Sequence, residues 1–131
     1  MAALNVTDNN TQNRGRTVVA AVNDLMFGSK VRGAAEQLGV RVVFARSSEA
    51  LHEHAAGAGL VLLDLDTRWL DVDADIRRLK TAAATSTVAV VAFGSHLQTE
   101  TLTAARTAGA DRVMARSAFV KVLPELLRGL Q

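Results

Sequence analysis

The sequence predicts a single α/β domain in which five helices surround a five-stranded parallel sheet. Short runs of β-branched and small apolar residues alternate with segments whose apolar residues recur at helical spacing. Strands that alternate with helices in this way pair in parallel through right-handed crossovers. The length of 131 residues and the 49% of hydrophobic residues suit one domain with a buried core. With helices on both faces of the sheet, the expected strand order is 2-1-3-4-5.

The strands are expected at residues 17–22, 40–45, 60–65, 88–93 and 111–115. The third of these runs, LVLLDL, is the most apolar, so we expect it to be buried on both faces. Residues 1–16 precede the first strand and are rich in Asn, Thr and Gln without any periodicity. We therefore expect a flexible N-terminal tail over 1–16 and a domain over 17–131.

Each helix between these strands carries a boundary signal. Residues that cap helix N-termini stand before the second and third helices: Ser47 or Ser48, and Asp71 or Asp73. Glycines end the first and fourth helices: Gly39 and Gly109. The third helix has an expected inner stripe of Ile76, Leu79 and Ala83. The fourth is expected over 97–108, and Ser117 is expected to open the last, where Pro124 falls in the first turns or kinks the helix.

Composition excludes several classes of function. The absence of cysteine excludes disulfide scaffolds, zinc–thiolate and iron–sulfur sites and thiol catalysis. A net charge of +2, dispersed basic residues and few aromatic residues argue against a nucleic-acid partner. No apolar stretch reaches the roughly 18 residues of a membrane span, so we expect a cytoplasmic protein with no membrane partner. Phosphate-binding glycine motifs, a serine elbow and a Ser/His/Asp set are not apparent, so we expect no enzyme.

Candidate site residues follow from the expected topology. In a sheet of this order, ligands bind at the carboxyl ends of the strands, where the order switches between strands one and three. The residues just past the strand ends are Asn23 and Asp24, Asp64 and Asp66, Gly94, Ser95 and His96, and Arg116 and Ser117. Asp24 and Asp64 are expected to converge there as a site for a hard cation such as Mg²⁺. The alternative is that Asp24 only caps the first helix and that Asp64 forms a salt bridge with Arg116.

Two stretches carry a family resemblance: LVLLDLDT around Asp64, and AGADRVMARSAF over 108–119. In this order and spacing, the chain from residue 17 onward resembles the receiver domain of bacterial two-component response regulators, which has a flavodoxin-like fold. The resemblance implies that Asp64 is the phosphoacceptor and that Asn23, Asp24 and Asp64 are Mg²⁺ ligands, with weak affinity because the family has two acids where this chain has Asn23 and Asp24.

Other positions depart from the family pattern. Gly94 stands where the family has a hydroxyl residue, and Ser95 is the candidate substitute. Arg116 replaces the family lysine, and Ser117 replaces a proline. An arginine there either holds a phosphoryl group or pairs permanently with Asp64. These departures resemble those of an atypical or pseudo-receiver.

The leading hypothesis is therefore a stand-alone receiver-like signalling domain of a two-component phosphorelay, with Asp64 as candidate phosphoacceptor and a degenerate switch. It would act on a protein partner such as a histidine kinase or a downstream effector, or as a homodimer through the fourth helix, fifth strand and fifth helix. Where they are exposed, Leu97, Leu102, Val113 and Val122 would belong to that surface. The alternatives are a phosphorylation-independent small-molecule or nucleotide binder and a scaffold or dimerisation module with an inactive pocket.

Overall fold

A computed structural model describes residues 15–130, and strands and helices alternate in it as predicted. The elements are β1 (Thr17–Ala21), α2 (Leu25–Gln37), β2 (Arg41–Phe44), α3 (Ser48–Ala55), β3 (Leu60–Asp64), α4 (Val72–Thr81), β4 (Ala89–Gly94), α5 (Thr99–Ala108), β5 (Arg112–Ala115) and α6 (Arg116–Arg128). Among these residues, every helix is too short or too polar to cross a lipid bilayer. Most of the tail expected over 1–16 lies outside the described residues. Arg16 is described, and its carbonyl accepts the N–H of Arg41.

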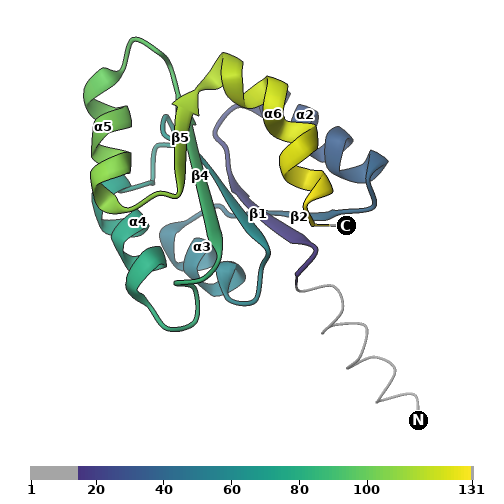
Figure 1. Cartoon of the computed structure of the whole chain (residues 1–131), viewed down its shortest axis with the longest axis horizontal. Helices are drawn as coiled ribbons and strands as arrows, with labels where there is room; N and C mark the ends of the chain where they lie inside the picture. The colour runs from purple at the N-terminus through teal and green to yellow at the C-terminus, as the bar shows by residue number, and fades with distance from the viewer. Residues whose placement is uncertain (1–14, 131) are drawn as a thin grey trace.

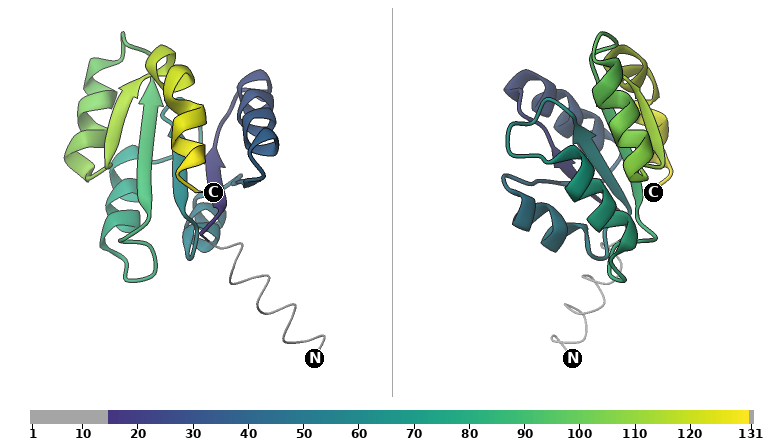
Figure 2. Two further views of the ribbon diagram at one scale, coloured as in Figure 1. Left: turned by 45° about the vertical axis from the view of Figure 1, so that its right-hand side comes forward. Right: turned by 90° about the vertical axis from the view of Figure 1, so that its left-hand side faces the viewer.

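The sheet is wholly parallel, and its order, β2-β1-β3-β4-β5, is the predicted one. Figure 1 shows α4 and α5 on one side of the sheet and α2 and α6 on the other. Figure 2 shows the same layers from two further directions. Successive side chains of β3 point to opposite faces. Val61 and Leu63 join the core on the side of α3, α4 and α5, whereas Leu60 and Leu62 join the core beneath α2 and α6. The predicted burial of this strand on both faces is confirmed.

The predicted boundary signals hold at most helices. Ser47 rather than Ser48 caps α3, and Asp71 rather than Asp73 caps α4, each by accepting a backbone N–H of the first turn. Gly39 and Gly109 follow helices α2 and α5 with φ angles of 68° and 111°, which residues with a Cβ rarely adopt.

Three details of the prediction are wrong. Ala83 is exposed beyond the end of α4, because that helix stops at Thr81. The last helix begins at Arg116 rather than at Ser117, directly after β5, and has no side-chain cap. Helix α5 begins at Thr99 instead of residue 97.

Pro124 lies well inside α6 and not in its first turn. The helix runs through it because Phe119, Leu123 and Leu127 bury one face of α6 in the core. Burial of such side chains contributes about 1.5–3 kcal/mol each, enough together to outweigh the roughly 3 kcal/mol cost of an interior proline. The packing therefore decides the conformation of this segment.

Candidate functional site

The carboxyl edge of the sheet is organised around an ion pair between Asp64 and Arg116. Asp64 is the last residue of β3 and is 2% exposed, and Arg116 is the first residue of α6. The Nη2 group of Arg116 donates to Oδ1 of Asp64 at 2.8 Å. The backbone N–H of Asp66 donates to the same oxygen at 2.9 Å. Because an unpaired buried carboxylate is very costly, these contacts are what allow Asp64 to lie inside the protein.

Asp66 extends this ion pair to a second carboxylate and to the start of α5. Its Oδ2 accepts from Nη2 of Arg116 at 3.2 Å, and its Oδ1 accepts from Nε2 of Gln98 at 3.0 Å. The hydrogen bond from Gln98 and then that from Arg116 lower the pKa of Asp66 below its usual value. Residues from the ends of β3, β4 and β5 are thereby joined in one network. Gln98 was not a predicted site residue, and no sequence motif marks it.

The guanidinium of Arg116 is held from a second direction by aromatic rings. Its Cζ lies 5.8 Å from the centroid of the Phe27 ring and 6.0 Å from that of Phe93. Phe93 in turn stacks on Phe119 with 4.0 Å between ring centroids, so the aromatic surface beneath the guanidinium is packed in place. Partial burial lowers the pKa of Arg116, but the hydrogen bond to Asp66 and the charge and hydrogen bond of Asp64 outweigh it and raise that pKa. The side chain is therefore a permanent cation.

Of the two predicted metal ligands after β1, Asp24 caps a helix. Asp24 is exposed, and its Oδ1 caps α2 by accepting the backbone N–H groups of Met26 at 2.8 Å and Phe27 at 3.3 Å. Asn23 is exposed beside it. Both contacts of the alternative interpretation, the helix cap and the salt bridge to Arg116, are thus present. Over residues 15–130, no three His, Asp or Glu side chains cluster in a way that could hold a metal ion. The assignment of Mg²⁺ to Asn23, Asp24 and Asp64 stays a prediction.

Gly94 leaves a buried acceptor without a donor. The last strand residue of β4 has no side chain, and the carboxamide of Gln98 lies over it. Asp66 only accepts hydrogen bonds, so the amide nitrogen of Gln98 faces it and Oε1 is directed away. That Oε1 is buried without a hydrogen-bond partner in the described part of the chain. Ser95, the candidate substitute, uses its hydroxyl oxygen to accept the backbone N–H of Leu97 at 3.2 Å.

A second polar cluster, which sequence reasoning missed, joins α3 to α4. Asp75 is 5% exposed and His52 is 8% exposed, and Nε2 of His52 lies 3.0 Å from Oδ1 of Asp75. The hydroxyl of Ser48 donates to the same Oδ1. Burial raises the pKa of Asp75, but the hydrogen bonds from Ser48 and His52 outweigh it, and the pKa is lowered. Ser48 and His52 both bond to the carboxylate, and in the described part of the chain no hydrogen bond joins the two side chains, so the cluster ties two helices together and is not a nucleophile–base pair.

The surface expected for output is only partly available. Leu97 is 79% exposed, but Leu102 is buried in the core. Val113 and Val122 are half-buried. Leu102 does not meet the condition of exposure, because the inner face of α5 packs on the sheet.

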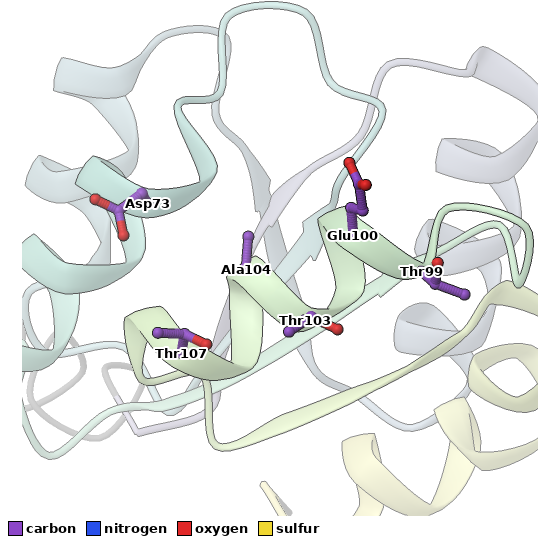
Figure 3. A pocket seen from close by; sticks show the side chains of 6 residues that line it. All are labelled: Asp73, Thr99, Glu100, Thr103, Ala104 and Thr107. Atoms are coloured by element: carbon purple, nitrogen blue, oxygen red, sulfur yellow. The ribbon is translucent and has the colours of Figure 1, made fainter.

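Two hollows lie away from Asp64 and Arg116. One, of about 440 Å³, lies beside α5. Its lining side chains, drawn in Figure 3, are Asp73, Thr99, Glu100, Thr103, Ala104 and Thr107. The other, also about 440 Å³, is lined by residues that follow β1 and β2 and by the first turns of α2. Asn23 and Asp24 are the predicted site residues that line it.

The arrangement of these elements is shared with known structures. A signal receiver domain of a response regulator from Bermanella marisrubri superposes with a TM-score of 0.71 at 18% identity, over 88% of this chain and 97% of that one. The chemotaxis response regulator CheY4 of Vibrio cholerae gives 0.71 at 13% identity, over 88% and 98% of the two chains. The chain has the fold of response-regulator receiver domains. The predicted fold class is confirmed.

A third receiver structure bears on the metal. The receiver domain of a sensor histidine kinase from Pseudomonas aeruginosa has a magnesium ion in its active-site cleft. It superposes with a TM-score of 0.69 at 14% identity, over 85% of this chain and 96% of that one. A scan against protein-family models and a search of curated protein sequences gave no match.

Proposed function

We propose that this chain is a receiver-type domain of a two-component signalling pathway in which Arg116 replaces the phosphorylation switch. Asp64 occupies the end of β3, the position of the candidate phosphoacceptor, but its charge is neutralised by Arg116 in one lasting conformation. The domain then acts by binding a protein partner, such as a histidine kinase or a downstream effector, and not by turnover. The observation that carries the proposal is the 2.8 Å contact between Arg116 and Asp64.

The chemistry of phosphoryl transfer supports this proposal. A carboxylate that accepts a phosphoryl group must attack phosphorus with a free oxygen, and a metal ion usually screens the incoming negative charge. Oδ1 of Asp64 already accepts from Arg116 and from the N–H of Asp66, which leaves Oδ2 alone for such an attack. Gly94 provides no hydroxyl to bind a phosphoryl oxygen. Asp66 holds the same guanidinium, so displacing Arg116 from Asp64 means breaking two ion pairs.

Exposed apolar side chains support a role in protein binding. Leu25 and Met26, at the start of α2, are 90% and 83% exposed, and Leu97 is 79% exposed. Large apolar side chains that gather at one edge of a soluble domain are typical of protein contacts. All three follow strand ends, and therefore belong to the edge that holds Asp64.

The test compares the wild type with a variant that restores the family residues, Asn23→Asp/Gly94→Ser/Arg116→Lys. Each protein is titrated with Mg²⁺ and then beryllofluoride, and amide NMR shifts and Trp69 fluorescence are recorded. Trp69 suits this because it lies in the loop after β3 and packs against the core. We expect no response of the wild type at millimolar Mg²⁺ and a saturable response of the variant that is centred on Asp64.

Asp64→Asn, introduced into both proteins, is the control, and it should remove the response of the restored variant. Shifts around Asp64 in the wild type that disappear in Asp64→Asn would contradict the proposal. They would mean that Arg116 yields to a phosphoryl group and that the pocket is a working phosphoacceptor.

A further inference from the structure

The hollow between α2 and β2 has the features of a ligand site distinct from the Asp64 site. It is about 440 Å³, within the usual size range of small-molecule sites, and its lining includes Asn23, Ser29, Arg32, Phe44 and Arg46. In the strand order, β2 and β3 lie on opposite sides of β1. The hollow, at the β2 side, is therefore separated from Asp64 by the end of β1, and a ligand site there is independent of the proposed function.

Its charge favours an anion. Arg32, on α2, and Arg46, just after β2, both line the hollow and are both exposed. Neither guanidinium has an ion-pair partner among residues 15–130. Asp24 is the acidic residue of the lining, so two guanidinium groups face one carboxylate and the hollow keeps a net positive charge. Two arginines that face one hollow can bind a phosphate through charge-assisted hydrogen bonds.

Its shape favours a planar ring beside that anion. The Cζ of Arg32 lies 5.0 Å from the centroid of the Phe44 ring, so the guanidinium stacks on the aromatic face. The outer face of a stacked guanidinium is a platform for a heteroaromatic ring. Gly28 lines the hollow and adds no side chain to it, and a Cβ at this position would make ordinary contact with Cε1 of Phe44, at 3.6 Å.

We propose that this hollow binds a mononucleotide, with the phosphate on Arg46 and the edge of Arg32 and the base stacked over the Arg32–Phe44 pair. Asn23 and Ser29 supply hydrogen-bonding groups for the ribose and the base edge. Because Asn23, Asp24 and Leu25 all line the hollow, a bound nucleotide contacts the segment that starts α2, including the exposed side chain of Leu25.

Amide NMR of the full chain during titration with adenosine monophosphate, adenosine and inorganic phosphate tests this proposal. We expect saturable shifts at residues 22–32 and 44–46 with adenosine monophosphate, and affinities at least about tenfold lower for the other two probes. Equal affinity for inorganic phosphate would overturn the stacking assignment, and equal affinity for adenosine would overturn the phosphate assignment.

Matched variants locate the ligand. Arg32→Gln should weaken adenosine monophosphate binding about tenfold or more, whereas Lys30→Gln, an exposed charge on the same helix outside the lining, should change it less than about twofold. Gly28→Leu should abolish binding by filling the hollow. Gly33→Leu is its control, because a Cβ at Gly33 meets nothing within 4 Å.

The affinities of the four variants are compared only if the amide NMR spectrum of each variant is that of a folded protein. The absence of shifts at millimolar nucleotide in the wild type, or shifts that survive both Arg32→Gln and Gly28→Leu, would overturn the proposal. Neither outcome bears on the Asp64–Arg116 ion pair, which the Mg²⁺ and beryllofluoride titrations test separately through their Asp64→Asn control.

Discussion

Replacing Gly94 with serine should stabilise the protein, because the new hydroxyl would reach an acceptor that now has no donor. Oε1 of Gln98 is buried without a partner, and a Cβ built at Gly94 lies 3.4 Å from it. A hydroxyl that donates at about 2.7 Å with a tetrahedral angle at oxygen needs about 3.4 Å between its carbon and the acceptor. The other neighbours of that Cβ, Leu65 and Leu102, lie at 3.5 and 3.7 Å, which is ordinary contact.

The size of the effect follows from two contributions. A buried acceptor without a partner costs about 1–3 kcal/mol, and a new neutral hydrogen bond returns about 1 kcal/mol of this. Loss of glycine also stabilises a strand by roughly 0.5–1 kcal/mol through the unfolded chain. Gly94→Ala carries the second contribution without the first. We therefore expect Gly94→Ser to exceed Gly94→Ala by about 1 kcal/mol, or about 4 °C in Tm.

Urea unfolding of the wild type and both variants measures the difference, provided that the m-values agree. The reasoning would be refuted if Gly94→Ser were no more stable than Gly94→Ala. That result would mean that the carboxamide of Gln98 turns or that water reaches Oε1. The additional variant Gln98→Leu is the control for the expected result, because it removes the acceptor and should erase the difference between serine and alanine.

Three further predictions concern stability. Arg116→Met should destabilise the fold by about 1–3 kcal/mol in urea unfolding, because it leaves the buried Asp64 carboxylate unpaired. The loss is moderate because a third of the Arg116 side chain is exposed, so solvent already screens the ion pair. Adding Asp64→Asn should recover most of the lost stability. The folded-state pKa of Asp75 lies below its ordinary 3.8, so its contribution to folding stability is complete above that pH and is lost as the pH falls through the lowered pKa. Asp75→Asn should therefore flatten the curve of stability against pH below about pH 4. An unchanged slope at acid pH would contradict this. Gly59→Ala should destabilise the protein by more than about 2 kcal/mol, because the new Cβ would overlap the carbonyl oxygen of Gly15. Gly33→Ala should stabilise it by roughly 1 kcal/mol, because Gly33 lies in the middle of α2 with open space around it. Equal thermal midpoints for the two variants would contradict this reasoning.

Local sequence determined the elements and their order. The spacing of apolar residues distinguishes strands from helices, and the short links between them leave parallel pairing as the solution. Asp71 and Gly109 illustrate the reason: a cap or a left-handed helix end is made by backbone groups within four residues, so the residue type carries the information. The same topology rule predicted that Asp64 and Arg116 would follow strand ends at one edge.

Tertiary structure decided what those residues do. Arg116 lies 52 positions from Asp64 and Gln98 lies 32 from Asp66, so their pairing depends on sheet register and side-chain rotamers that no local pattern encodes. The sequence left two roles open for Asp24 and Arg116, and packing supports the helix cap and the ion pair. The buried Ser48–His52–Asp75 tie and the Arg32–Phe44 stack have the same origin. The positions of strands and helices follow from the periodicity of apolar residues along the sequence, whereas contacts between distant polar side chains exist only once the chain has folded.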